Sequence, residues 1–126
     1  MIITKKILDE LTEQAKASPR LRMNFDLRNS SDDNSQRMLN ALEPGTVIPI
    51  HRHKETSETC VCVRGHFEEY FYDENGNLTE TIDMVPGGNI LNIEKGQWHQ
   101  FITVSELFRV LFLLSVPTVC VMHLYT

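Results

Sequence analysis

The chain has 126 residues, enough for one domain with one hydrophobic core. Its formal net charge is −5 at pH 7, which argues against nucleic acid as a partner, because phosphate binding needs clustered positive charge. The longest apolar run, residues 107–116, is too short to span a bilayer and contains Arg109, so we expect no membrane partner and interpret the run as a buried strand.

The N-terminal segment predicts a helix followed by a strand. Residues 4–17 carry one apolar stripe, formed by Ile7, Leu8, Leu11 and Ala15. Thr4 can act as the N-cap, and Pro19 prevents the helix from continuing. Residues 20–28 then alternate apolar and polar side chains, which is typical of a half-buried strand, and the polar residues 29–35 indicate a loop.

No apolar leader segment follows Met1, and the chain has three cysteines, an odd number. We therefore expect a cytoplasmic protein with free thiols.

After residue 35, short strand-like runs alternate with turn signals. The runs are 36–43, 47–53, 58–64, 67–73, 78–85, 90–93, 98–104 and 107–116. Asn75-Gly76 between two alternating runs is a strong hairpin signal, because both residues tolerate positive φ. This spacing predicts an all-β sandwich or barrel over residues 36–126, with residues 1–35 packed against it.

Four side chains form a candidate metal site. On a strand, residues i and i+2 project from one face, so His51 and His53 are expected to point together. Glu58 begins the next predicted strand and can return its carboxylate to the same place, and His99 begins a later strand after the turn at Gly96. Imidazole and carboxylate groups at this spacing suit one divalent cation.

These residues carry a family resemblance. The pattern Gly45-x5-His51-x-His53-x4-Glu58-x6-Gly65 matches the first motif of the cupin family. Gly88-x5-Glu94-x-Gly96-x2-His99 resembles the second motif, with Glu94 in place of the usual proline. The stretches SPRLRMNFDLR, QRMLNALEPGT and PIHRH also resemble the WbuC family of cupin metalloproteins, which are encoded among bacterial O-antigen genes.

The resemblance implies a cupin double-stranded β-helix, or jelly-roll barrel, with an N-terminal helix and an extra N-terminal strand. It implies that His51, His53, Glu58 and His99 bind one divalent transition metal, and Fe, Mn, Ni, Co and Zn all suit such a ligand set. The favoured function is a metal-dependent isomerase or epimerase acting on a sugar or sugar-nucleotide in surface-polysaccharide biosynthesis. The alternatives are a non-catalytic module that binds a metal or small ligand, and an Fe(II) dioxygenase.

Three further residues are candidates for binding an anionic sugar derivative: Arg22, Arg37 and Asn40. Guanidinium groups bind phosphate and carboxylate bidentately, although charges on an edge strand also serve to deter pairing with other chains. One of Glu68 and Glu69 must face the interior, where it can act as a base, although surface charge is the favoured role for these two residues. Cys60 and Cys62 are in phase with Glu58 and are interpreted as small core residues.

Ile48 and Ile50 are out of phase with the two histidines in the predicted strand 47–53. They are therefore expected to face away from the cavity, where other apolar surface must shield their side chains from water. A second subunit can supply this surface, so a homodimer is one expectation.

Overall fold

The computed structural model describes residues 1–46, 48–104 and 118–125, the last range for its backbone alone. Helix α1 (Lys5–Ala17) precedes strands β1 (Arg22–Asp26), β2 (Gln36–Leu42), β3 (Ser57–Arg64), β4 (Phe67–Tyr72), β5 (Leu78–Met84), β6 (Ile90–Ile93), β7 (Trp98–Thr103) and β8 (Thr118–Tyr125). Within these ranges, no helix has the length and apolar character of a membrane span. The predicted class, mostly β with one N-terminal helix, is confirmed.

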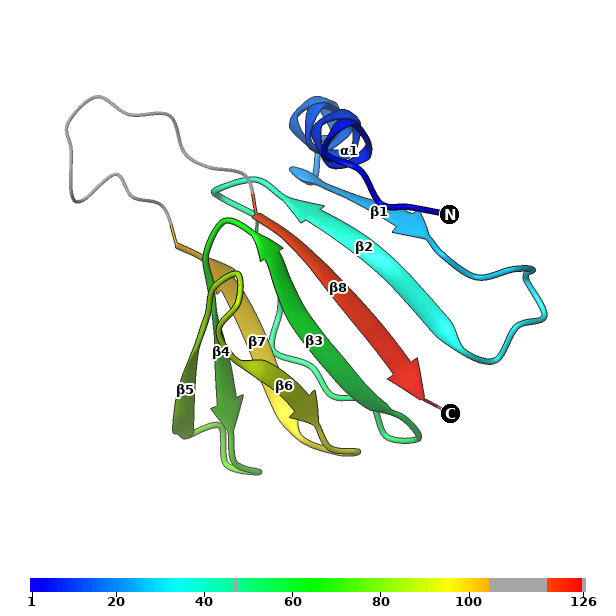
Figure 1. The fold of residues 1–126 in the computed structure, drawn as a ribbon. Helices are drawn as coiled ribbons and strands as arrows, with labels where there is room; N and C mark the ends of the chain where they lie inside the picture. The colour runs from blue at the N-terminus through cyan, green and yellow to red at the C-terminus, as the bar shows by residue number, and fades with distance from the viewer. Residues whose placement is uncertain (47, 105–117, 126) are drawn as a thin grey trace, which may run out of the picture.

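The strands form two antiparallel sheets. The larger has the order β1-β2-β8-β3-β6, and the smaller has the order β5-β4-β7. Figure 1 shows the two sheets leaning together, with α1 lying across one end of β1 and β2. The main core lies between the sheets and consists of Leu42, Ile48, Cys60, Cys62, Phe67, Met84 and Phe101.

A second apolar cluster fixes α1 on the outer face of β1 and β2. Leu11 and Ala15 of the helix pack against Leu39 and Ala41 of β2, and all four are buried. Thr4 caps the helix through its side chain, as predicted. Arg64 of β3 adds a polar link, because its guanidinium donates to Asp9, Thr12 and the carbonyl of Leu8.

Strand β8, which the sequence analysis did not predict, occupies the middle of the larger sheet. Its backbone pairs with β2 on one side and with β3 on the other. It therefore joins the N-terminal strands to the rest of the barrel. The predicted strand at 107–116 lies outside the described residues.

The predicted strand at 47–53 is wrong. Of the described residues 48–53, only His51 makes a β-bridge, with His99, and the rest have no strand pairing. Pro49 has no backbone N–H to donate, which prevents a regular ladder here. Ile48 is consequently buried against the core instead of facing away, whereas Ile50 is 45% exposed.

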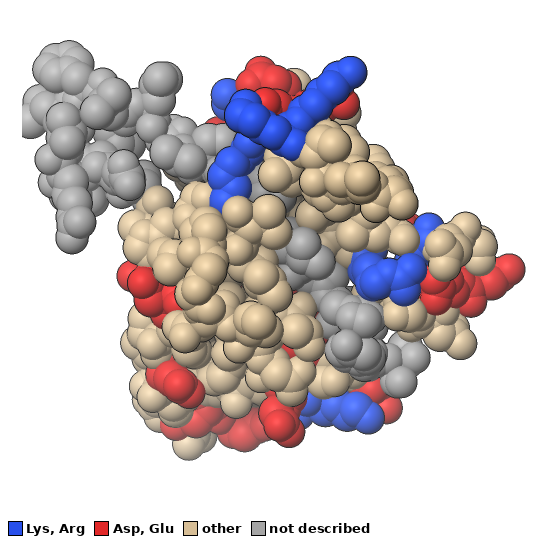
Figure 2. Space-filling view, viewed as in Figure 1, with Lys and Arg blue, Asp and Glu red and all other residues tan. Residues whose placement is uncertain are grey.

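The Asn75-Gly76 hairpin between β4 and β5 is confirmed. Gly76 has φ +81°, and its N–H donates to the carbonyl of Asp73 at 3.1 Å. On the face seen in Figure 2, acidic side chains gather over the part of the molecule built from the smaller sheet, whereas acidic and basic side chains are mixed over the helix.

The packing of α1 predicts that Leu11→Ala lowers the free energy of unfolding by about 2–4 kcal/mol, because a buried leucine side chain is replaced by a cavity. Urea denaturation measures this change. Gln14→Ala on the exposed face of the same helix is the control and should change stability little. Equal stabilities of the two variants would contradict the described helix packing.

Candidate metal centre

Two backbone hydrogen bonds join the segment that carries His51 to the strand that carries His99. The N–H of His51 donates to the carbonyl of His99 at 3.0 Å, and the N–H of His99 donates to the carbonyl of His51 at 2.8 Å. Gly96, in the turn before β7, donates to the carbonyl of His53 at 2.8 Å. These bonds bring together histidines that are 48 positions apart in the chain (99 − 51).

The three imidazole rings form a cluster. Ring centroids are 4.3 Å apart for His51 and His99, 5.2 Å for His51 and His53, and 5.6 Å for His53 and His99. One nitrogen from each ring lies within 4.8 Å of the other two. Two nitrogens bound to one ion at about 2.1 Å are at most about 4.2 Å apart, so small ring rotations are sufficient for all three to bind it.

Hydrogen bonds to the backbone fix the tautomers of two of the rings. Nδ1 of His51 lies 2.8 Å from the carbonyl oxygen of Pro49, and Nδ1 of His99 lies 2.9 Å from that of Gln97. Because a carbonyl oxygen only accepts, each Nδ1 carries a hydrogen, and Nε2 is the nitrogen that is left to bind a metal. Metal-bound histidines are oriented by the same kind of hydrogen bond.

Glu58 lies on one side of this cluster. Its Oε2 is 3.2 Å from Nε2 of His53 and 3.8 Å from Nε2 of His99. The side chain is 1% exposed, and neither carboxylate oxygen has a hydrogen-bond partner among the described residues. Burial raises the pKa of this carboxyl to about 7. Glu58 as a fourth ligand remains a prediction, but its position is consistent with that role.

The cluster also suits a cation electrostatically. Burial, together with the neighbouring imidazoles, lowers the pKa of His99 to about 4, and burial lowers that of His53. His99 is therefore neutral at pH 7 and its buried Nε2 lacks a hydrogen-bond partner in the described part of the chain. A bound cation would satisfy this nitrogen and the Glu58 carboxylate together. The residues fit a divalent transition metal.

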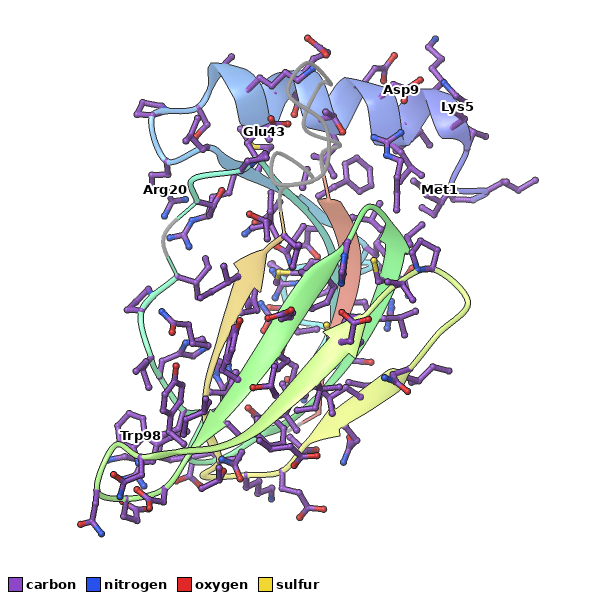
Figure 3. The ribbon with its side chains drawn as sticks, turned by 90° about the vertical axis from the view of Figure 1, so that its left-hand side faces the viewer. Met1, Lys5, Asp9, Arg20, Glu43 and Trp98 are labelled. Carbon is purple, nitrogen blue, oxygen red and sulfur yellow. The ribbon has the colours of Figure 1, made fainter. Side chains whose placement is uncertain are left out.

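Arg52, between His51 and His53, anchors their segment from outside. Its guanidinium lies 4.5 Å from the centre of the Trp98 ring and donates to Glu74 at 2.9 Å. The Trp98 indole also donates to Glu74, at 3.3 Å. Trp98 has the opposite parity from His99 on β7 and points away from the side that carries His99, and Figure 3 shows it at the edge of the barrel.

An open cavity of about 280 Å³ adjoins the histidines. His51, His53 and Glu58 line one part of it, and Ile48 and Phe101 contribute apolar surface. A further part is lined by polar side chains of β1, β2 and the residues just before β1: Arg20, Arg22, Asn24 and Asn40. Two of the predicted substrate residues, Arg22 and Asn40, therefore share a cavity with the predicted metal ligands.

Arg37, the third predicted substrate residue, lies elsewhere. Its guanidinium donates to the carbonyls of Leu27 and Ser35 and pairs with Asp33. It does not line the cavity, because it has the opposite parity on β2 from Asn40. Conversely, Arg20 and Asn24 line the cavity but were not among the predicted substrate residues. Each is two positions from Arg22, and this spacing indicates that the three share one face of the strand.

The inward face of β4 is now defined. Phe67 and Glu69 are buried, so Glu69 is the glutamate that faces the interior. Its Oε1 has no hydrogen-bond partner among the described residues. Cys60 and Cys62 are small buried residues of the core, as predicted.

Comparison with known proteins identifies the family. The family described as Domain of unknown function (DUF6016) matches residues 3–84, from the helix through β5. The chain belongs to this family. No curated protein matches it in sequence.

Solved structures show that the fold is cupin-like. A cupin 2 domain-containing protein from Halorhodospira halophila aligns with TM-score 0.62 at 17% identity, over 82% of this chain and 63% of that one. Recombinant oxalate oxidase in complex with glycolate aligns with TM-score 0.62 at 14% identity, over 85% of this chain and 52% of that one. The capsular polysaccharide assembling protein CapF from Staphylococcus aureus aligns with TM-score 0.62 at 20% identity, over 85% of this chain and 28% of that one. The chain thus spans less than two thirds of each of these proteins.

Glu69 gives a testable dependence of stability on pH in the metal-free protein. Burial, and then the nearby charge of Glu58, raises the pKa of Glu69 from 4.5 to about 9. Between pH 7 and pH 9 the folded state therefore keeps a proton that the unfolded state has lost, so the free energy of unfolding falls as pH rises. The slope is at most about 1.4 kcal/mol for each pH unit for this one group.

Urea denaturation of chelator-treated protein at pH 7, 8 and 9 measures this slope. Glu69→Gln should flatten it, and Glu80→Gln on the exposed part of β5 should leave it as in the wild type. Parallel curves for wild type and Glu69→Gln would show that the Glu69 carboxyl does not hold its proton in the folded state.

Proposed function

We propose that this protein is a metal-dependent enzyme that acts on a small sugar derivative. The observation that carries the proposal is the cluster of His51, His53 and His99, which lies beside Glu58 at the wall of an open cavity. A purely structural metal site is closed by protein ligands, whereas a site for catalysis leaves room for water or substrate. Here the cavity reaches the cluster directly.

The chemistry favoured is isomerisation or epimerisation. A divalent metal on the histidines would supply Lewis-acid polarisation of a substrate oxygen. The chain itself supplies the apolar surface of Ile48 and Phe101, which limits water around the reacting groups, and polar side chains on β1 and β2 that can orient a sugar. A carboxyl with a pKa near 7, such as that of Glu58, is well suited to proton transfer when it is not bound to the metal.

The proposed setting is bacterial surface-polysaccharide biosynthesis. The resemblance to the WbuC family supports it, and one of the structural neighbours is named as a capsular polysaccharide assembling protein. The size of the cavity, about 280 Å³, is just below the range of about 300–1,000 Å³ that is usual for drug-sized ligands. This volume therefore favours a ligand whose reacting portion is about the size of a monosaccharide.

Elemental analysis of protein purified without chelator tests the metal, with His51→Ala as the comparison. We expect about one transition-metal ion for each chain in the wild type and at least a tenfold lower content in the variant, because removing one imidazole from a three-histidine site removes a principal ligand. Ser57→Ala, which lies close to the site without contributing an imidazole or carboxylate, is the control and should retain the metal. Equal contents in wild type and His51→Ala would contradict the site.

Incubation of the metal-loaded protein with sugars, sugar phosphates and nucleotide-sugars tests the reaction. Isomerisation or epimerisation independent of oxygen is the expected result. Oxygen consumption that requires iron and a substrate would instead establish a dioxygenase. Tight binding of a panel member without turnover would establish a non-catalytic binding module.

A further inference from the structure

Two arginines beside the cavity have no partner for their charge among the residues that the structure describes. The guanidinium groups of Arg20 and Arg22 make no hydrogen bond or ion pair with any described residue, although Arg22 is half-buried. Figure 3 shows Arg20 beside the connection that leaves β2. Two adjacent cations repel each other, so their placement on one wall is unfavourable unless an anion offsets it.

The other arginines in the described part of the chain are paired. Arg28 pairs with Asp26, Arg37 with Asp33, Arg52 with Glu74 and Arg64 with Asp9. The protein has an excess of acidic residues, with 17 Asp and Glu against 12 Lys and Arg. Carboxylates are therefore plentiful, and yet no carboxylate of the described residues forms an ion pair with the two arginines of the cavity.

The backbone between the two arginines is held in a rare conformation. Leu21 has φ +54°, the one positive φ at a non-glycine residue in the described ranges. Its carbonyl accepts hydrogen bonds from the N–H of Glu43 at 2.8 Å and from the hydroxyl of Thr46 at 2.7 Å. Such a conformation costs on the order of 1–3 kcal/mol and persists where the surroundings over-determine it, often at ligand-binding sites. Here it lies between two residues that both line the cavity, Arg20 and Arg22.

The strand pairing explains why this wall faces the cavity. Asn24 is opposite Asn40, and Arg22 is opposite Leu42, in the β1–β2 register. All four residues line the cavity, whereas the residues between them, Met23 and Ala41, lie in the cluster that packs around α1. The helix thus fixes one face of these strands and directs the other toward the histidines.

We propose that Arg20 and Arg22 form an oxyanion-binding subsite for the ligand of this cavity, holding a phosphate or carboxylate group while another part of the ligand reaches His51, His53 and His99. The proposal rests on the proposed function for the reacting end of the ligand. Guanidinium groups bind both kinds of oxyanion through paired N–H donors. Asn24 provides an amide beside them that can donate to the same group.

A solvated edge strand is the competing explanation, because β1 is at the edge of the larger sheet and charges there deter pairing with other chains. That explanation accounts for charge on β1 but not for its location in the cavity or for the fixed backbone at Leu21. It also predicts no affinity for anions, which makes the two explanations separable.

Calorimetric titration of metal-free protein at low salt provides the test, with inorganic phosphate and acetate as separate probes. We expect at least one of them to bind to the wild type, and the double variant R20Q/R22Q to bind it at least about tenfold more weakly, because two charge-assisted contacts are lost. The control R28Q/K6Q removes the same net charge from residues outside the cavity and should bind as the wild type does. The probe that binds with the higher affinity indicates whether the ligand carries a phosphate or a carboxylate group.

Two results would overturn the subsite: no binding of either probe to the wild type, or equal binding by the wild type and R20Q/R22Q. The variant His51→Ala separates the subsite from the metal centre. It should keep phosphate binding, since the subsite needs no metal. Anion binding that is lost in His51→Ala but retained in R20Q/R22Q would place the anion on the histidines and refute the proposal.

Discussion

The backbone pairing of His51 with His99 is the constraint on which the candidate site depends. The segment that carries His51 and His53 has no regular strand pairing, so this bridge and the bond from Gly96 to His53 determine where the two side chains point. The outer contacts of Arg52 with Trp98 and Glu74 hold the same segment from the solvent side. This irregular segment, held at several points, places two imidazoles beside a third from β7.

The alternation of side chains on β1 and β2 gives these strands two roles at once. One face packs against α1 through Leu39 and Ala41, and the other lines the cavity through Asn24 and Asn40. The N-terminal helix therefore contributes to the site without touching it, because its packing fixes the wall opposite the histidines. The match to the DUF6016 family, over residues 3–84, includes this helix as well as β1 and β2.

Much of this was predictable from local patterns. Thr4 and Pro19 defined the helix, alternation defined β1, and Asn75-Gly76 defined the β4–β5 hairpin, since each depends on residues close together in the chain. The three histidines were identified from motif spacing, and the structure brings them together. The prediction of a strand at 47–53 was wrong because it relied on period-two alternation, which takes no account of the missing backbone N–H of Pro49.

Other features depend on long-range packing that no local pattern contains. Glu69 of β4 faces inward because it is paired with the buried Phe101 of the neighbouring strand β7. Arg37 lies away from the cavity because it is on the same face of β2 as Leu39 and Ala41, which pack against α1. The position of β8 between β2 and β3 likewise joins segments from opposite ends of the chain. Arg20 received less weight than Arg22 and Arg37, because its place beside the cavity depends on the backbone conformation of Leu21, which the sequence does not reveal.

X-ray absorption spectroscopy of the metal-loaded protein tests the central claim most directly, because it reports the atoms bound to the ion. The account predicts three imidazole nitrogens from His51, His53 and His99, with additional oxygen scattering at about 2.0–2.2 Å that decreases in Glu58→Gln. Sulfur scattering at about 2.3 Å, or fewer than three imidazoles, would contradict it and would move the metal away from the histidine cluster.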